Sequence, residues 1–121
     1  MAIIGLGTDI VEIARFKPAQ LTKIAKRVLT QSEYELFLHH KQQQRFLAKR
    51  WAAKEAAAKA VGTGIAKGVS FQDFNISNLE SGAPVMSISG VAESLLKRPF
   101  KVHISISDEQ THAVATVIIE R

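Results

Sequence analysis

The sequence predicts a single α+β domain, because helical patterns fill its first half and strand patterns fill most of its second half. An alanine-rich segment at residues 42–61 has apolar residues at helical spacing. Short apolar or alternating runs separated by turn signals follow between residues 69 and 120. With 121 residues and 46% hydrophobic content, residues 1–121 suit one domain with its own core. We expect an antiparallel sheet packed against the long helix.

The chain begins with a predicted strand at residues 2–7, which is apolar and contains Gly5 and Gly7. Asp9 follows directly, and a carboxylate at the end of a strand is well placed for a functional site.

Two short helices are expected next. Pro18 suits a first helical position, and the apolar residues between it and residue 28 recur at helical spacing. The basic side chains of this segment then point outward, which makes it an amphipathic basic helix. The second helix starts after residue 30, with Thr30 or Ser32 as its cap.

The long helix at residues 42–61 is the clearest element, since alanine has the best helix propensity and Gly62 is a natural stop. Strands are then predicted at residues 69–77, 83–89, 100–107 and 112–120. Residues 90–98 are predicted to form a short helix that stops at Pro99.

The charge is unevenly distributed. Residues 1–50 contain nine Lys or Arg against four acidic residues, and the net charge of the whole chain is +5. Five basic residues and no acidic one lie between Arg15 and Arg27. This segment is either a solvated basic face or a docking face for nucleic acid, a phosphorylated ligand or an acidic protein.

The sequence contains neither cysteine nor an apolar run long enough to span a membrane, and its opening residues do not have the pattern expected of a secretory leader. We therefore expect a cytoplasmic protein without a disulfide or a thiolate metal site.

Glu55 and Lys59 on the long helix are one turn apart and project from the same face. The simple interpretation is an exposed ion pair worth about 0.3–0.5 kcal/mol. The alternative is a phosphate site, in which the carboxylate holds a hard cation and the lysine meets the phosphate oxygens. The alanines nearby would let backbone or ligand approach, and the backbone N–H groups of residues 62–64 are candidates for phosphate contact.

Mg²⁺ on a diphosphate needs only one or two protein carboxylates, because phosphate and water oxygens complete its shell. Asp9 is the leading companion for Glu55, although a capping or turn role suits it equally. Asp108 is a third candidate, although an aspartate at this position more commonly serves as the polar residue that begins a turn.

Three segments together, "GLGTDIVEI" (residues 5–13), "RFLAKRWAAKEAAAKAVGTGI" (45–65) and "HISISDEQTHAVATVIIER" (103–121), closely resemble the bacterial holo-acyl-carrier-protein synthases, a family of phosphopantetheinyl transferases. Their order, spacing and the chain length all fit. The resemblance implies the 4′-phosphopantetheinyl transferase fold and a role in fatty-acid biosynthesis.

The resemblance also implies the reaction, a Mg²⁺-dependent transfer of 4′-phosphopantetheine from coenzyme A to a serine of apo acyl carrier protein. Adenosine 3′,5′-bisphosphate is released. Asp9 and Glu55 would hold the metal, and Lys59 would neutralise charge on the phosphoryl groups. The residues suited to coenzyme A phosphates are Arg45, Arg50, Lys59, Gly62 and Gly64.

Asp108 stands where many members of the family have histidine, so a histidine-based proton role does not transfer to this chain. We expect Asp108 to accept a contact from water or metal. The base that takes the serine proton stays open between a magnesium-bound water and Glu55 acting through water.

Residues 112–120 are apolar on both alternating sets, which indicates that a subunit interface covers the second face. The family resemblance makes this assembly a homotrimer with sites between subunits. It also makes an acidic acyl carrier protein the partner for the basic segment, through Arg15, Lys23, Lys26 and Arg27.

Two other classes of function remain as rivals: a module that binds nucleic-acid phosphates, and a structural subunit whose alanine face packs against another helix. Low aromatic content (7%) and the absence of an RNA-recognition motif disfavour the first. Neither nucleic acid nor a membrane is an expected partner.

Overall fold

The computed structural model describes residues 2–121, and the alanine-rich segment forms its longest helix, α3 (Gln43–Val61), as predicted. Its seven alanines between Ala48 and Ala60 are all buried. The helix ends at Gly62, whose φ of 103° is a left-handed conformation that glycine adopts without strain.

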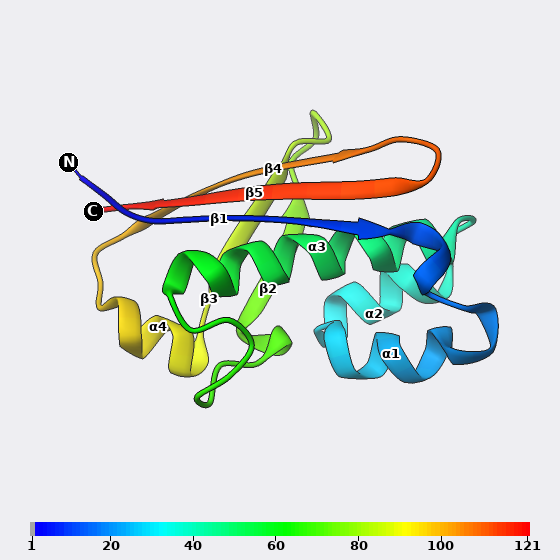
Figure 1. Cartoon of the computed structure of the whole chain (residues 1–121), viewed down its shortest axis with the longest axis horizontal. Helices are drawn as coiled ribbons and strands as arrows, with labels where there is room; N and C mark the ends of the chain where they lie inside the picture. The colour runs from blue at the N-terminus through cyan, green and yellow to red at the C-terminus, as the bar shows by residue number, and fades with distance from the viewer. Residues whose placement is uncertain (1) are drawn as a thin grey trace.

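A three-stranded antiparallel sheet lies along one side of α3 (Figure 1). Its strands, in spatial order, are β1 (Ile3–Glu12), β5 (His112–Glu120) and β4 (Lys101–Asp108). The side chains of β5 that face α3 are fully buried: Ala113, Ala115, Val117 and Ile119. The strands predicted at residues 100–107 and 112–120 are therefore confirmed.

Strand β1 is longer than the sequence predicted, because it runs to Glu12 rather than ending at Gly7. It pairs with β5 along its whole length, with Gly7 opposite Val117 and Asp9 opposite Ala115. Asp9 therefore lies within the strand, not after it. Since its partner Ala115 faces α3, Asp9 also faces α3.

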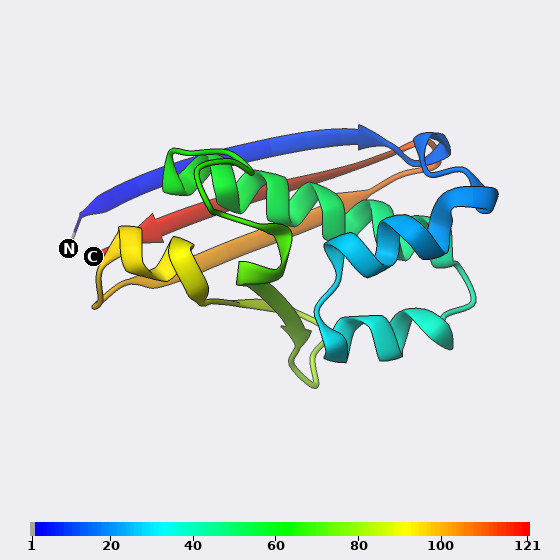
Figure 2. The same cartoon turned by 90° about the horizontal axis from the view of Figure 1, so that it is seen from below.

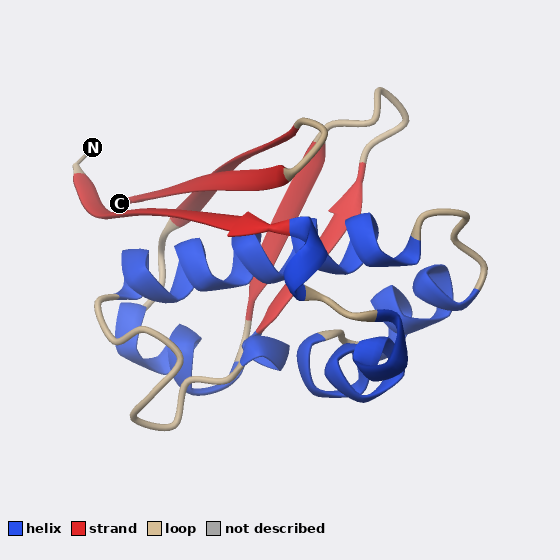
Figure 3. Ribbon diagram, turned by 45° about the vertical axis from the view of Figure 1, so that its right-hand side comes forward, coloured by secondary structure: helices blue, strands red, loops and turns tan. Residues whose placement is uncertain are grey.

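A second antiparallel sheet, of two strands, accompanies the predicted one. It is a hairpin of β2 (Phe74–Asn78) and β3 (Pro84–Ile88), which crosses behind α3 in Figure 3. The predicted strand at 69–77 starts late because Phe71–Asp73 forms a 3-10 turn that buries the Phe71 ring. The predicted short helix is α4 (Gly90–Leu96).

Two short helices, α1 (Leu21–Val28) and α2 (Gln31–Leu38), pack at the end of α3 opposite α4 (Figure 2). Thr30 caps α2, and Glu33 completes a capping box with it. α1 is amphipathic, as predicted, with Ala25 and Val28 buried.

The basic segment is only partly helical, which corrects the sequence interpretation. Arg15 ends one 3-10 turn (Ile13–Arg15), Pro18 begins another (Pro18–Gln20), and the α-helix starts at Leu21. Arg15 and Lys17 therefore precede α1 instead of lying on it.

The α+β class is confirmed. Within residues 2–121, no helix is both long enough and apolar enough to cross a membrane.

Candidate active site

Asp9 is brought to the long helix by the two glycines before it on the same face of β1. A Cβ atom on Gly5 would overlap the carbonyl oxygen of Ala60, and one on Gly7 would overlap that of Ala56. Only glycine permits so close an approach of strand and helix backbones. Two residues further along β1, Asp9 is therefore held against the same helix.

Lys59 joins β1 to α3 at this point. Its Nζ atom donates to Asp9 Oδ1 at 3.1 Å and to the Thr8 carbonyl oxygen at 2.9 Å. Lys59 is half exposed, whereas the Asp9 side chain is 17% exposed. Lys59 thus pairs with a carboxylate from another element, and the exposed Glu55–Lys59 ion pair considered from the sequence is not formed among the described residues.

Glu55 completes a cluster of three charged groups. Partial burial and the negative charge of Asp9, in that order, raise the pKa of the Glu55 carboxyl above its ordinary value. The positive charges of Lys59, Arg15 and Arg27 act in the opposite direction. Two carboxylates are thus close enough to repel each other, which is an arrangement that suits a bound cation.

Arg15 and Arg27 are neighbours of this cluster that sequence reasoning placed elsewhere. The sequence indicates a docking role for both in the basic segment, and in the structure their charges also act on the Glu55 carboxyl. No local pattern signals this proximity, because it depends on how α1 and the segment before it pack against α3.

Asp108 lies away from the cluster. It accepts a hydrogen bond from Arg45 Nη1 at 2.8 Å and lies 3.6 Å from Lys49 Nζ. Arg45 also donates to the carbonyl oxygens of Glu109 and Gln110, so it fastens the β4–β5 turn to the start of α3. The hydrogen bond from Arg45 lowers the pKa of Asp108.

Asp108 and Asp9 are on opposite edge strands, with Asp108 opposite Ala113 and Asp9 opposite Ala115 of β5 between them. Two strand spacings separate them by about 10 Å. Within one chain, Asp108 is therefore not part of the Asp9, Glu55 and Lys59 cluster.

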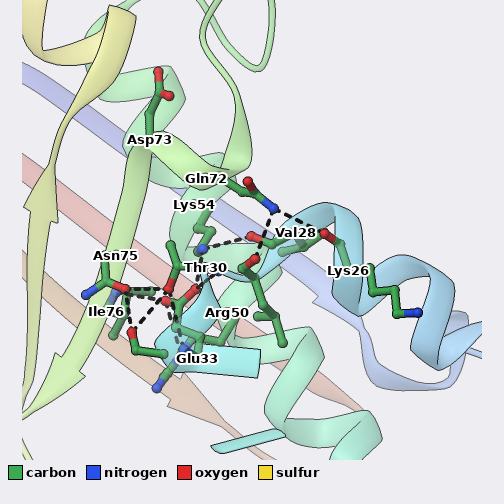
Figure 4. Close-up of polar contacts among 12 residues, drawn as sticks. Lys26, Val28, Thr30, Glu33, Arg50, Lys54, Gln72, Asp73, Asn75 and Ile76 are labelled. Atoms are coloured by element: carbon green, nitrogen blue, oxygen red, sulfur yellow. Dashed lines mark hydrogen bonds and ion pairs between the residues drawn. The ribbon is translucent and has the colours of Figure 1, made fainter. Parts of the chain in front are cut away.

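Arg50 is 6% exposed and belongs to a buried polar cluster that the sequence analysis did not identify (Figure 4). Its Nε lies 3.6 Å from Glu33 Oε2 and has no hydrogen-bond partner. Glu33 also receives hydrogen bonds from Lys54 Nζ and from the backbone N–H groups of Thr30 and Ile76. Burial lowers the pKa of Lys54, and the adjacent Glu33 carboxylate opposes that shift.

Two sequence signals point to this cluster. The segment "TQSE" at residues 30–33 matches a capping box, and Lys54 occupies a position on the apolar stripe of α3. A charged residue on a buried stripe needs a partner.

The loop after α3 does not offer its backbone to a ligand in the way that the sequence suggested. The N–H groups of Gly62, Thr63 and Gly64 all donate to the Ala58 carbonyl oxygen, so they cap the carboxyl end of α3. That end of a helix is also the negative end of its dipole. Contact of Gly62 and Gly64 with coenzyme A stays a prediction. It cannot rest on these N–H groups, because they already donate to the Ala58 carbonyl oxygen.

An open cavity of about 650 Å³ lies beside the first turns of α3. Its cationic lining residues are Arg45, Lys49 and Arg50, and Phe46 adds an aromatic surface. Within residues 2–121, no group of three or more His, Cys, Asp and Glu residues forms a potential metal cage. A metal at Asp9 and Glu55 would need further ligands from a bound molecule or water.

Comparisons with known proteins show the family of this chain. The model of the 4′-phosphopantetheinyl transferase superfamily matches residues 5–118. A holo-[acyl-carrier-protein] synthase of Aliivibrio fischeri (strain MJ11) is 54% identical, over 99% of this chain and 99% of that protein.

Solved structures extend the similarity to three dimensions. The Bacillus anthracis holo-(acyl-carrier-protein) synthase, crystallised in complex with CoA (3′,5′-ADP), is 39% identical with a TM-score of 0.83, over 97% of this chain and 96% of that one. The corresponding synthase of Neisseria meningitidis is 37% identical with a TM-score of 0.85, over 99% and 100%.

Proposed function

This chain belongs to the holo-[acyl-carrier-protein] synthase family of the 4′-phosphopantetheinyl transferase superfamily, and we propose that Asp9, Glu55 and Lys59 carry its Mg²⁺-dependent transfer reaction. The donor is coenzyme A and the acceptor is a serine of apo acyl carrier protein. The serine oxygen loses its proton and bonds to the phosphorus that bears pantetheine. The bond from that phosphorus to the bridging oxygen breaks, and adenosine 3′,5′-bisphosphate leaves.

The convergence of Asp9 from β1 with Glu55 and Lys59 from α3 is the observation that carries this proposal. Asp9 and Glu55 would hold Mg²⁺, and their mutual repulsion in a partly buried place favours a cation between them. When bound, Mg²⁺ neutralises the charge of the diphosphate. The ammonium group of Lys59, already directed at this point, would stabilise charge on the phosphoryl oxygens.

We predict that Arg45 and Arg50 bind the phosphates of coenzyme A. Each arginine has a structural requirement for this contact. Arg45 is about 15 Å from Glu55 along α3, and Arg50 about 7.5 Å, at the helical rise per residue. A phosphate at Arg45 must compete with the Asp108 carboxylate, and one at Arg50 must reach a largely buried guanidinium. The cavity lined by both side chains supports this location.

Assembly as a homotrimer is supported by the face of the three-stranded sheet that points away from α3. Leu6 and Ile10 on this face are 65% and 66% exposed, and among residues 2–121 no element covers it (Figure 3). Exposed apolar side chains gathered on one face of a sheet are typical of an interface.

Docking of an acidic acyl carrier protein is assigned to the basic side chains on and before α1. Lys23 and Lys26 are exposed on α1, and Arg15 and Arg27 lie nearer the cluster. Opposite charges would guide the carrier toward the site and fix its orientation. A place in fatty-acid biosynthesis and in the cytoplasm stays a prediction.

The test incubates the protein with apo acyl carrier protein, coenzyme A and Mg²⁺, followed by mass spectrometry of the carrier. We expect the carrier to gain one phosphopantetheine. Asp9→Asn and Glu55→Gln should each remain folded by circular dichroism and lose activity by about 10²-fold or more. The exposed Glu80→Gln variant, in the β2–β3 connection, is the matched control. Near-normal transfer by both folded site variants would exclude the assignment.

A further inference from the structure

An aromatic wall lies beside the Asp9, Glu55 and Lys59 cluster. The rings of Trp51 and Phe71 have centroids 4.8 Å apart, and Phe16 meets Trp51 edge-on at 5.6 Å. Phe16 and Phe71 are buried, whereas Trp51 is only partly buried. Trp51 also lies one helical turn before Glu55, so the wall borders the site.

Two guanidinium groups rest on this wall. Arg15 Cζ is 5.1 Å from the centroid of the Trp51 ring, and Arg27 Cζ is 5.6 Å from that of Phe71. Within residues 2–121, neither side chain forms an ion pair or donates a hydrogen bond to another group. Stacking on a ring face leaves the in-plane N–H donors of a guanidinium free.

The wall therefore connects two arginines that come from separate segments, one before α1 and one in its last turn. Because the two rings touch, both guanidinium groups lie against one aromatic cluster that is packed on α3. An unstacked arginine would have to lose its rotational freedom when a partner binds. A stacked arginine has already lost much of it.

We infer that Trp51 and Phe71 form a positioning platform, which presents the free N–H donors of Arg15 and Arg27 to carboxylates of the acidic carrier beside the transfer site. The inference rests on the proposed function, since it concerns how the carrier is seated there. Carboxylates are the fitting ligand class because each guanidinium offers paired donors that match a carboxylate in bidentate geometry. Trp51 acts through Arg15 and is not a catalytic residue.

The test compares steady-state kinetics of Trp51→Leu, which keeps an apolar side chain but removes the ring face, with Trp51→Phe, which keeps a ring. Trp51→Leu should raise KM for the carrier about two- to five-fold, the range expected for one cation–π contact. Its kcat and coenzyme A affinity by titration calorimetry should be unchanged. Trp51→Phe should restore most of the loss.

A matched control and a second variant show whether a change in KM for the carrier comes from the position of Arg15, from a folding defect or from a loss of charge. Phe100→Leu removes the ring beneath Arg98, a similar contact at 4.9 Å in the connection between α4 and β4, and should leave KM unchanged. Arg15→Lys keeps the charge and the fold but loses the planar guanidinium, so its carrier KM should also rise. Combined with Trp51→Leu, its effect should be less than additive, because both variants disrupt one contact.

Unchanged carrier KM in both Trp51→Leu and Arg15→Lys, in protein that transfers phosphopantetheine normally, would overturn the platform and leave the proposed function intact. Loss of coenzyme A affinity with normal carrier kinetics would assign the arginines to the donor and also overturn it. Failure of the unsubstituted protein to modify any apo carrier would refute the proposed function itself, and the platform with it.

Discussion

Glu55 lies in an environment that is unfavourable for its own charge. Partial burial and Asp9 raise its pKa, and Lys59 pairs with Asp9 instead of with Glu55. Such an arrangement lowers the stability of the folded protein, and it is expected where a bound ligand of opposite charge offsets the loss.

Replacing Glu55 with glutamine should stabilise the protein in the absence of metal. The folded-state pKa of Glu55 is raised, so its ionisation opposes folding at pH values above that pKa. The opposition disappears below the ordinary pKa of 4.5, where the group is neutral in both states. Glu55→Gln should therefore melt at a higher temperature than the unsubstituted protein near pH 7, and at the same temperature near pH 4.

Differential scanning calorimetry without added Mg²⁺ measures this difference, with the exposed Glu35→Gln as the control. A Glu55→Gln variant that melts lower at neutral pH would contradict the prediction.

Lys54 is the residue on which the buried polar cluster most depends, since Lys54 and Glu33 are both fully buried. Lys54→Met keeps most of the side-chain volume but leaves the Glu33 carboxylate without its nearest cation. We expect a loss of about 3–5 kcal/mol in the free energy of unfolding, measured by urea denaturation. Lys23→Met, an exposed change on α1, should cost less than about 0.5 kcal/mol. Similar small losses for both would show that the ion pair is dispensable.

Helix α3 has different roles on its different faces. The backbone of Ala56 and Ala60 lies in close contact with β1. Lys54 donates a hydrogen bond to Glu33 of the α2 capping box. Glu55 and Lys59 lie on the side of the helix that faces Asp9. Alanine is needed where a strand must approach, since any larger side chain would push the strand away.

The contact between β1 and α3 should therefore control both stability and activity. Gly7→Ala places a methyl group against the carbonyl oxygen of Ala56, and β1 must move to relieve the overlap. Overpacking of this kind costs about 1–3 kcal/mol or more. Because Asp9 is two residues away, transfer activity should fall by more than the loss of folded protein explains. Activity measured at a temperature where the variant is fully folded tests this point, and unchanged activity there would contradict it.

At the scale of the whole molecule, the three-stranded sheet has one face on α3 and one that the described chain leaves open. Ile3, Leu6 and Ile10 of β1 are all more than half exposed on the open side. A monomer would expose this surface to water, which favours self-association.

Light scattering should give the mass of a trimer at micromolar concentration for the unsubstituted protein. Ile10→Asp places a charge on the open face and should produce folded monomers with little activity, if sites form between subunits. Leu79→Asp, at an exposed position on the β2–β3 connection, should not change the mass. A monomer mass for the unsubstituted protein would contradict the homotrimer.

The sequence by itself determined the elements whose signals are local. α3 was predictable because alanine content, a 3.6-residue repeat and Gly62 act over neighbouring residues, and β5 because its apolar run is bounded by turn residues. Three motifs also indicate the family, and they contain Asp9, Glu55 and Lys59. The end of β1 was missed, because backbone pairing with β5 extends it beyond its glycines.

Only the tertiary structure decided which charges meet. Lys59 pairs with Asp9 because the glycines of β1 allow the strand to touch α3, and Arg45 pairs with Asp108 because the β4–β5 turn reaches the start of that helix. Arg15, before α1, and Arg27, in its last turn, approach Glu55 by packing on Trp51 and Phe71. Each of these contacts joins residues far apart in the chain, and its partner depends on the packing of whole elements, which no local pattern encodes.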